Sequence, residues 1–557
     1  MKRVLLSFLL ALPFFLSAQL KYPATKKVNQ VDGYHGQAKV EDPYRWLEDD
    51  NSADTKAWVK DENKVTFDYL STIPIREQVR KRLETLWNYT RYASPFKKGQ
   101  YYYYWKNDGL QNQSVLYRQL GIVGKPEVFL DPNKLSKEGI AAIGNYGFSK
   151  SGKYFGYTVA VAGSDWQEGY IMETATKKLL SEKIEWIKFG GFDWKNDEGF
   201  YYSGYEKPAD ENSKLTKTNE FNIVKYHELN TAQSADKLVY VDLEHPLRYH
   251  SAGLTEDGRF LILNVSQGTS GSELYFMDNK DQSMVRFELL VPGFESDSYV
   301  IDNKGDKLLV MTNEDAPNFK VVAIKARTPR EREEEEKERR EKNKITRRET
   351  EEEMKQEMKE QWVTVIPEKD MALQSVSTGG GYLFASYLKD ASTRVYQYTY
   401  DGKLVREIKL PGLGTASGFS GEKKDNEVFY SFTSFNSPLT IYRYNLATGV
   451  STLFRKPEVK VKTDDLVTEQ VFFKSKDGTK VPMFLTYKKG IVKNGQNPVL
   501  MYGYGGFNIP VTPSFSVSNA FFMEQGGIYA SVNLRGGSEY GEKWHKEGMR
   551  LACLGLL

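Results

Sequence analysis

The chain has 557 residues and a mass of 63.9 kDa, which is too long for one hydrophobic core and predicts at least two domains. Its 77 basic and 74 acidic residues leave a formal net charge of +3, too small for a protein that binds nucleic acid through its charge. The aromatic fraction of 13%, with 45 Gly and 20 Pro, excludes a disordered or collagen-like chain and favours short strands joined by tight turns. A single cysteine, Cys553, excludes an intramolecular disulfide framework and a cysteine-cluster metal site.

Residues 1–18 have the pattern of a secretory signal peptide. Lys2 and Arg3 precede an apolar run from Val4 to Leu16, and a small residue, Ala18, follows at the expected cleavage site. The alternative is a buried N-terminal helix, which the charged flank and the terminal position disfavour. No second apolar run is long enough to span a membrane. We therefore expect an exported protein, periplasmic or secreted, that is not attached to a membrane after signal cleavage.

A repeated unit fills the middle of the chain and predicts a seven-bladed β-propeller over residues 91–460. Each unit has a Gly- or Asp-rich turn, an aromatic or β-branched strand, a polar turn and a second strand. The first strands begin near Gly99, Gly152, Gly199, Gly258, Gly305, Gly380 and Asn426. A period of about 50 residues with several strands per unit is typical of propeller blades. A single β-sandwich, the alternative, would not need so long a segment.

One interval between units is longer because it contains a charged insertion, residues 327–361. Glu, Lys and Arg make up most of this segment, and no apolar stripe is present to pack against another element. Glu and Lys favour helix, and pairs three or four residues apart stabilise an exposed helix slightly. We expect a solvated helical insertion or a mobile tail; a specific partner-binding role is the less favoured alternative.

The two flanks of the propeller differ from it in character. Residues 19–90 contain a stretch with helical spacing of apolar side chains, and residues 461–557 read as strands and turns of an α/β sheet. In the second flank, the turn 476–479 predicts a hairpin, and the apolar runs 499–502 and 528–532 predict buried core strands. We expect the two flanks to form one domain into which the propeller is inserted.

Four motifs resemble the prolyl oligopeptidase family of serine peptidases. They are D-P-Y-R-W-L-E-D (42–49), S-K-D-G-T-K-V-P-M (475–483), Y-G-Y-G-G-F-N (502–508) and N-L-R-G-G-S-E-Y-G-E-K-W-H (533–545). They occur in the family's order from about residue 22 to residue 548. The resemblance implies a seven-bladed β-propeller inserted into an α/β-hydrolase domain. It also implies hydrolysis of short peptides on the carboxyl side of proline, by a monomer without metal or organic cofactor.

The resemblance also assigns three site residues. Tyr504 corresponds to the tyrosine whose hydroxyl stabilises the oxyanion, a role worth about 3 to 4 kcal/mol for one donor. Phe507 corresponds to a ring of the proline pocket, and Phe189 to a propeller residue that lines a neighbouring subsite. Without the resemblance, both phenylalanines would be interpreted as ordinary core aromatics.

The catalytic residues of a serine hydrolase are missing from the sequence. No serine has glycine at both flanking positions of the pattern G-x-S-x-G; Ser538, in Gly536-Gly-Ser-Glu-Tyr540, fails that test. His545 lies in a family motif upstream of the elbow and is not the triad histidine. The segment from Met549 to Leu557 departs from the family pattern, and we expect a chain truncated before the catalytic triad and inactive by itself.

Two other functions compete with this interpretation. A non-catalytic propeller protein that binds peptides or partners would account for the missing nucleophile, but it would have little use for Tyr504 or for half of a hydrolase sheet. A metal-dependent peptidase is disfavoured because the sequence has no H-E-x-x-H motif and no clustered metal ligands. The sequence therefore favours a proline-specific serine endopeptidase.

Overall fold

A computed structural model describes residues 20–34, 36, 38–208, 218–281, 284–343 and 351–549. The predicted signal peptide and Cys553 lie outside these ranges. The chain divides into two compact units, one up to Glu84 and one from Thr85 onward, and each is described by itself. Among the described residues, no helix is both long enough and apolar enough to cross a membrane.

The first unit holds a short hairpin followed by helices. Strands β1 (Val31–Tyr34) and β2 (Ala38–Glu41) pair antiparallel, and helix α1 spans Ala53–Ser71. The α1 helix begins at Ser52, whose hydroxyl accepts a hydrogen bond from the Thr55 amide and so satisfies one free donor of the first turn. A 3₁₀ turn, η1 (Arg45–Glu48), precedes α1, and α2 (Arg76–Trp87) runs across the boundary between the units.

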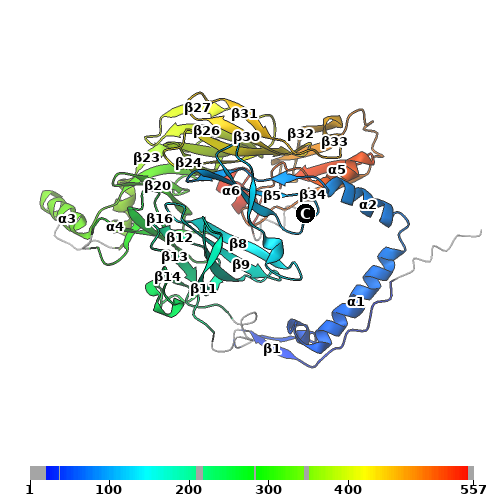
Figure 1. The fold of residues 1–557 in the computed structure, drawn as a ribbon, viewed down its shortest axis with the longest axis horizontal. Helices are drawn as coiled ribbons and strands as arrows, with labels where there is room; N and C mark the ends of the chain where they lie inside the picture. The colour runs from blue at the N-terminus through cyan, green and yellow to red at the C-terminus, as the bar shows by residue number, and fades with distance from the viewer. Residues whose placement is uncertain are drawn as a thin grey trace, which may run out of the picture. The chain divides into compact units, whose positions relative to one another are not determined.

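The second unit opens with a β-propeller of seven blades (Figure 1). Blade 1 comprises β3 (Arg91–Tyr92), β4 (Phe96–Lys98), β5 (Tyr101–Asn107), β6 (Val115–Leu120) and β7 (Glu127–Leu130). Blade 2 comprises β8 (Ala141–Phe148), β9 (Tyr154–Val161), β10 (Trp166–Glu173) and β11 (Lys178–Lys188). Blade 3 comprises β12 (Asp193–Lys195), β13 (Gly199–Gly204), β14 (Ile223–Glu228) and β15 (Lys237–Val241). Neighbouring strands in each blade pair antiparallel. A single pairing, Ile187 with Gly204, joins blades 2 and 3 into one sheet.

Blades 4 to 7 are four-stranded sheets built in chain order. Blade 4 comprises β16 (Tyr249–Leu254), β17 (Phe260–Ser266), β18 (Ser272–Asp278) and β19 (Glu288–Val291), and blade 5 comprises β20 (Ser298–Lys304), β21 (Lys307–Thr312), β22 (Lys320–Lys325) and β23 (Val363–Ile366). Blade 6 comprises β24 (Ala372–Gly379), β25 (Tyr382–Lys389), β26 (Ser392–Thr399) and β27 (Leu404–Ile408). Blade 7 comprises β28 (Thr415–Ser420), β29 (Glu427–Ser434), β30 (Ser437–Asn445) and β31 (Ser451–Arg455). The seven starts found in the sequence are those of the second strand of each blade. The predicted propeller is confirmed.

Apolar side chains of adjacent blades interlock to form the propeller core. Between blades 4 and 5, Phe260 and Phe276 of one sheet pack with Leu308 and Val310 of the next, and all four are fully buried. Side chains on a strand alternate between the two faces of the sheet, so each blade presents one apolar set to each neighbour. Burial of one such side chain contributes about 2 to 3 kcal/mol.

Side chains close the ring between blade 7 and blade 1, because in the described part of the chain these two blades share no strand. The guanidinium of Arg455, the last residue of β31, lies 4.7 Å from the Tyr92 ring and 4.0 Å from the Tyr104 ring. Between the same two blades, Lys98 forms an ion pair of 3.1 Å with Glu422. Ring closure thus combines cation–π stacking with a partly buried ion pair.

A turn of blade 7 also reaches across to three other blades. The Lys423 amide donates to Glu256 of blade 4 at 2.8 Å, and its ammonium pairs with Asp302 of blade 5 at 2.5 Å. The Tyr400 hydroxyl of blade 6 donates to the same Asp302 carboxylate at 2.7 Å. Asp302 is only 3% exposed, so its charge is stabilised by these two donors rather than by water.

We predict that Lys423→Ala lowers the free energy of unfolding by about 1.5 to 3 kcal/mol, because it leaves the buried Asp302 carboxylate without its charged partner. The neighbouring Lys424→Ala is the control: its ammonium pairs with Glu422 at 2.8 Å at the surface, and we expect a loss of at most about 1 kcal/mol. Urea unfolding of both variants measures the difference. Equal losses in the two variants would contradict the role given to Lys423.

The charged insertion forms two helices within blade 5. Helices α3 (Pro329–Asn343) and α4 (Glu351–Glu360) lie between β22 and β23, and α3 projects away from the propeller (left in Figure 1). Near the ends of the insertion, Arg332 donates to the Leu289 carbonyl at 2.6 Å and Lys359 pairs with Glu314 at 2.5 Å. The helical insertion predicted from the sequence is confirmed, and its two ends are fixed to the propeller by polar contacts.

The remaining strands form a four-stranded mixed sheet in the order β32-β33-β35-β34. The bounds are β32 (Leu466–Lys474), β33 (Lys480–Lys488), β34 (Val499–Gly503) and β35 (Ile528–Val532), with helices α5 (Val517–Glu524) and α6 (Gly541–Lys546). The predicted hairpin joins β32 to β33, where Gly478 takes a positive φ of 86° in the turn. Strands β34 and β35 run parallel, as in α/β folds.

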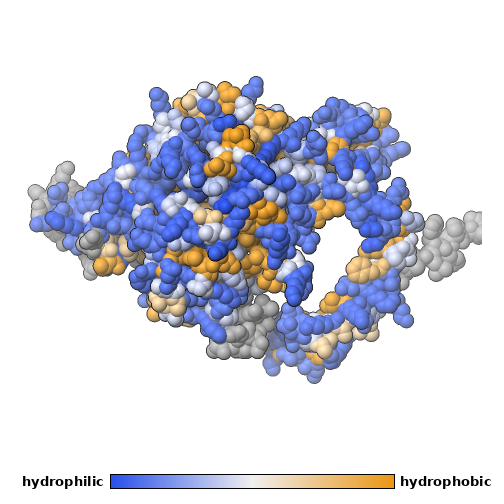
Figure 2. Space-filling view, in the orientation of Figure 1, coloured by the Kyte–Doolittle hydropathy of each residue, from blue (hydrophilic) through white to orange (hydrophobic). Residues whose placement is uncertain are grey.

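The sequence predicts a buried strand at 499–502. The strand is present, but the prediction that it is buried is wrong. All five residues of β34 are exposed, Met501 to 64%. The reason is that β34 pairs only with β35 among the described strands and so forms the edge of the sheet. Strand β35, which lies inside the sheet, is buried as predicted. Figure 2 shows that a largely hydrophilic surface is interrupted by such apolar patches.

Contacts with blades 5 to 7 hold this sheet against the propeller. The Tyr540 hydroxyl donates to Asp390 at 2.8 Å, and Thr415 donates to the Pro513 carbonyl at 2.7 Å. Phe435 of blade 7 packs in one cluster with Phe484 of β33. Apolar and polar contacts together fix the position of the loop that follows β34.

Candidate active site

The loop after β34 presents Tyr504 and Phe507 to solvent. Their side chains are 47% and 74% exposed, and the ring centroids lie 6.5 Å apart with an angle of 34° between the planes. Phe507 and Asn508 both take positive φ, 53° and 56°, a conformation that costs a residue other than glycine about 1 kcal/mol or more. The surrounding chain must therefore impose this geometry on the loop.

Close packing of two glycines provides part of that constraint. A Cβ atom at Gly536 would lie 2.2 Å from the Gly505 carbonyl oxygen, so only glycine fits there. In the same contact the Asn508 amide donates to the Gly536 carbonyl at 3.0 Å, and the His545 Nδ1 atom lies 2.7 Å from that oxygen. The motif at 533–545 thus packs directly against the loop that carries Tyr504.

Two buried polar side chains hold the far end of the loop. Asn533 donates to the Val511 carbonyl at 2.6 Å, and the Val511 amide donates to a Glu539 carboxylate oxygen at 2.9 Å. Asn533 also donates to that oxygen at 3.2 Å. Burial raises the pKa of the Glu539 carboxyl. The sequence did not identify Asn533 or Glu539 as site residues. The only pattern that could have indicated them is the presence of two polar side chains in a motif that directly follows an apolar strand.

We predict that Glu539→Gln reduces the loss of stability that accompanies a rise in pH above the usual carboxyl pKa. Because the folded protein raises the pKa of Glu539, it binds this proton more tightly than the unfolded chain does. The resulting stabilisation is present at low pH and is lost as the pH rises above the usual carboxyl value and through the raised pKa. Glutamine cannot ionise, so the unfolding free energy of the variant should fall less over this range.

Ser538→Gly is the control for this measurement. The Ser538 hydroxyl donates to Gln374 of β24 at 3.2 Å, so its loss should lower stability by about 1 kcal/mol at every pH. An unchanged pH slope in Glu539→Gln would show that Glu539 is not the group that titrates.

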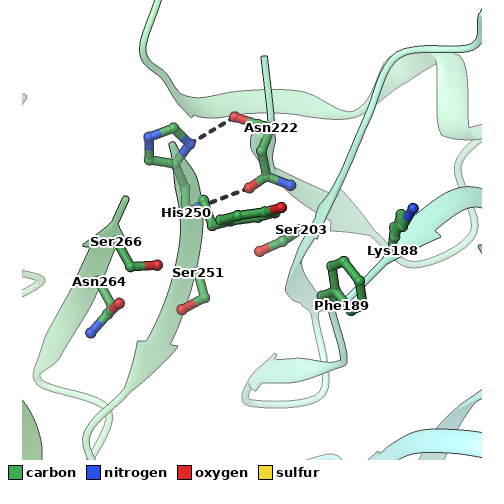
Figure 3. Close-up of a pocket in the computed structure, with 9 residues that line it drawn as sticks. Lys188, Phe189, Ser203, Asn222, His250, Ser251, Asn264 and Ser266 are labelled. Carbon is green, nitrogen blue, oxygen red and sulfur yellow. Dashed lines mark hydrogen bonds between the residues drawn. The ribbon is translucent and has the colours of Figure 1, made fainter. Parts of the chain in front are cut away.

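Phe189 lies in a different place, a pocket of about 240 Å³ lined by residues of blades 2, 3 and 4 (Figure 3). It is 60% exposed, takes a φ of 56°, and meets the Tyr249 ring edge-on at 6.2 Å. The pocket is lined by Lys188, Phe189, Ser203, Asn222, Tyr249, His250, Ser251, Asn264 and Ser266. None of these residues belongs to the loop after β34, so the structure brings Tyr504 and Phe507 together and places Phe189 in a separate pocket.

A larger cavity, of about 480 Å³, lies where the propeller meets the segments around Asn508 and Ser538. Asn508, next to Phe507, lines it together with Ser538 and residues of blades 5 and 6 such as Tyr299 and Gln374. The loop that carries Tyr504 and Phe507 therefore borders a cavity shared by the two parts of this unit.

The histidines in the described ranges make structural contacts. His227 and Asp236 lie 2.7 Å apart and are buried, and the Tyr202 hydroxyl donates to the same aspartate at 2.6 Å. His250 makes a ring contact of 2.8 Å with the Asn222 carbonyl. Within the described ranges, no cluster of three His, Cys, Asp or Glu side chains could hold a metal ion.

Comparison with known proteins agrees with this architecture. Residues 22–457 match the family profile described as the prolyl oligopeptidase N-terminal beta-propeller domain, and residues 513–552 match that of the prolyl oligopeptidase family. A prolyl endopeptidase of Elizabethkingia meningoseptica is 46% identical over 532 residues, which cover 96% of this chain and 71% of the relative. The prolyl endopeptidase of Elizabethkingia miricola is similar to the same degree.

Solved structures are similar over the same length. A structure from a study of two prolyl endopeptidases superposes with a TM-score of 0.84 at 31% identity, covering 96% of this chain and 74% of that one. Prolyl oligopeptidase B from Galerina marginata, bound to a macrocyclization substrate, gives a TM-score of 0.82 at 29% identity, covering 96% and 75%.

The fold and the comparisons define a seven-bladed β-propeller inserted into an α/β-hydrolase domain. The fold class predicted from the sequence is confirmed. The chain belongs to the prolyl oligopeptidase family of serine peptidases.

Proposed function

We propose that this chain provides the peptide-binding part and the oxyanion donor of a serine endopeptidase that cleaves short peptides after proline. The loop with Tyr504 and Phe507 carries this proposal, because it presents a phenol and a flat apolar ring side by side, in a strained conformation, next to a cavity. Strained backbone conformations cluster at active sites and ligand-binding loops. The 46% identity to a prolyl endopeptidase supports the same activity.

Each of the two side chains has a separate task in this proposal. The Tyr504 hydroxyl donates a hydrogen bond to the oxyanion of the tetrahedral intermediate, which stabilises the transition state more than the substrate. The exposed Phe507 ring packs against the pyrrolidine ring of the substrate proline. Phe189, in its separate pocket, contacts a more distant residue of the peptide. The flanking segments 19–90 and 461–557 belong to the hydrolase domain, and residues 91–460 to the propeller.

The 557 residues contain no G-x-S-x-G nucleophile elbow, and we propose that the chain does not acylate by itself. Peptide binding and hydrolysis are therefore separate properties here. No metal or organic cofactor enters the proposed reaction, which is acyl transfer to a serine and then to water.

We predict that the purified chain binds a blocked proline peptide but does not hydrolyse it. Phe507→Ala should weaken binding about tenfold, because the proline loses its apolar partner. Phe472→Ala, an exposed aromatic change on the β32–β33 hairpin, is the matched control and should leave binding unchanged. Fluorescence anisotropy measures binding, and release of a chromogenic amide measures hydrolysis. Turnover by the chain would contradict the absence of a nucleophile, and binding that ignores proline would contradict the assigned specificity.

We further propose that the protein is an exported monomer, periplasmic or secreted, that binds neither nucleic acid nor membrane once residues 1–18 are removed. The charged and apolar pattern of those residues supports export. We predict that the mature protein begins near residue 19. N-terminal sequencing of the cell-free or periplasmic fraction tests this, and an intact Met1 in the cytoplasm would contradict it.

A further inference from the structure

The pocket beside Phe189 has a positively charged wall. Lys188 lines it, and its ammonium lies 5.1 Å from the Trp166 ring and 5.4 Å from the Phe189 ring. The side chain is only 13% exposed, and its carboxylate partner among the described residues, Asp165, lies at 4.0 Å, the outer limit of an ion pair. Cation–π contacts compensate an ammonium only partly for lost hydration. Lys188 can therefore take a closer anionic partner.

The rest of the pocket offers hydrogen-bonding groups that have no partner in the described structure. Figure 3 shows Ser251, Asn264 and Ser266 on the blade 4 side and Ser203 opposite them. None of the four makes a side-chain hydrogen bond to another described residue, and among the described residues no carboxylate lines the pocket. Asn222 differs, because its amide group bonds to the Gly204 carbonyl and the His250 amide.

We propose that this pocket binds an acidic side chain of the peptide substrate, with Lys188 as the residue that determines the preference. The carboxylate of Glu or Asp would meet the ammonium at the pocket wall and accept hydrogen bonds from the unpartnered hydroxyl and amide groups. The Phe189 and Tyr249 rings at the same pocket contact the methylene groups of that side chain. A charge-assisted hydrogen bond discriminates strongly between an acidic side chain and a neutral one, because its loss leaves desolvated polar groups without a hydrogen-bond partner.

This inference rests on the proposed function, and its test uses the 557-residue chain with two series of peptides. Each peptide is acetylated, amidated and labelled with a neutral fluorophore, and carries either Glu or Gln one to four residues before a single proline. Because both ends are blocked, the side chain provides the only carboxylate. We expect at least one Glu peptide to bind about fivefold or more tightly than its Gln counterpart, with a preference that declines as salt is added.

Two substitutions test the assignment to Lys188. Lys188→Met keeps an apolar stem against Trp166 and should bring the affinities for the Glu peptide and the Gln peptide to the same value. Asn264→Asp adds a carboxylate to the opposite wall and should lower the affinity for the Glu peptide more than the affinity for the Gln peptide. The control is Lys183→Met on the same strand, whose ammonium pairs at the surface with Glu168 at 2.7 Å. It should retain the preference.

The outcomes separate the inference from the function on which it rests. Equal binding of Glu and Gln peptides at every position, or a preference that survives Lys188→Met, overturns the inference and leaves the proposed function intact. Failure of every proline peptide to bind overturns both. Circular dichroism of each variant shows that the propeller is folded.

Discussion

Closure of the propeller ring by side chains is the contact on which the rest of this structure depends. Blades 1 and 7 share no strand in the described part of the chain, so the Arg455 guanidinium between the Tyr92 and Tyr104 rings takes the place of backbone pairing. Every other blade is held on both sides by apolar packing, which requires that the ring be complete. The pocket at Phe189 and the cavity beside the hydrolase strands both lie where different sheets meet.

The hydrolase motif at 533–545 serves mainly as a scaffold. Gly536 allows two backbone segments to touch, and Asn533 and Glu539 form a buried hydrogen-bonded pair that fixes Val511. Neither the Asn533 nor the Glu539 side chain lines the cavity beside the loop. Their contribution is the conformation of the loop that carries Tyr504 and Phe507, and preorganisation of that kind gives an oxyanion donor its effect.

The sequence predicted most of the fold because the second and third strands of each blade are rich in aromatic and β-branched residues. The sequence does not predict the innermost strand of each blade, because these strands are short or contain many small and polar residues. Strand β28, for example, has the sequence T-A-S-G-F-S. The error at β34 has a different origin. An apolar run reveals strand propensity, whereas burial depends on whether another strand or helix covers it, and Met501 is not covered by any described element.

The site could be predicted only in part, for a similar reason. Tyr504 and Phe507 lie in a recognisable motif, and their proximity follows from being three residues apart in one loop. The roles of Glu539 and Lys188 depend on contacts with Val511 and Trp166, which are distant from them in sequence. A linear sequence pattern does not predict such contacts.

The charged insertion leaves the propeller at β22 and returns at β23, two strands that pair with each other. A segment whose ends are held a strand's width apart can change in length at little cost, since each doubling of a flexible loop costs only about 0.6 kcal/mol. Residues 327–361 are thus the position at which foreign sequence, such as a fluorescent reporter or an affinity tag, can enter this chain without disturbing the register of any blade.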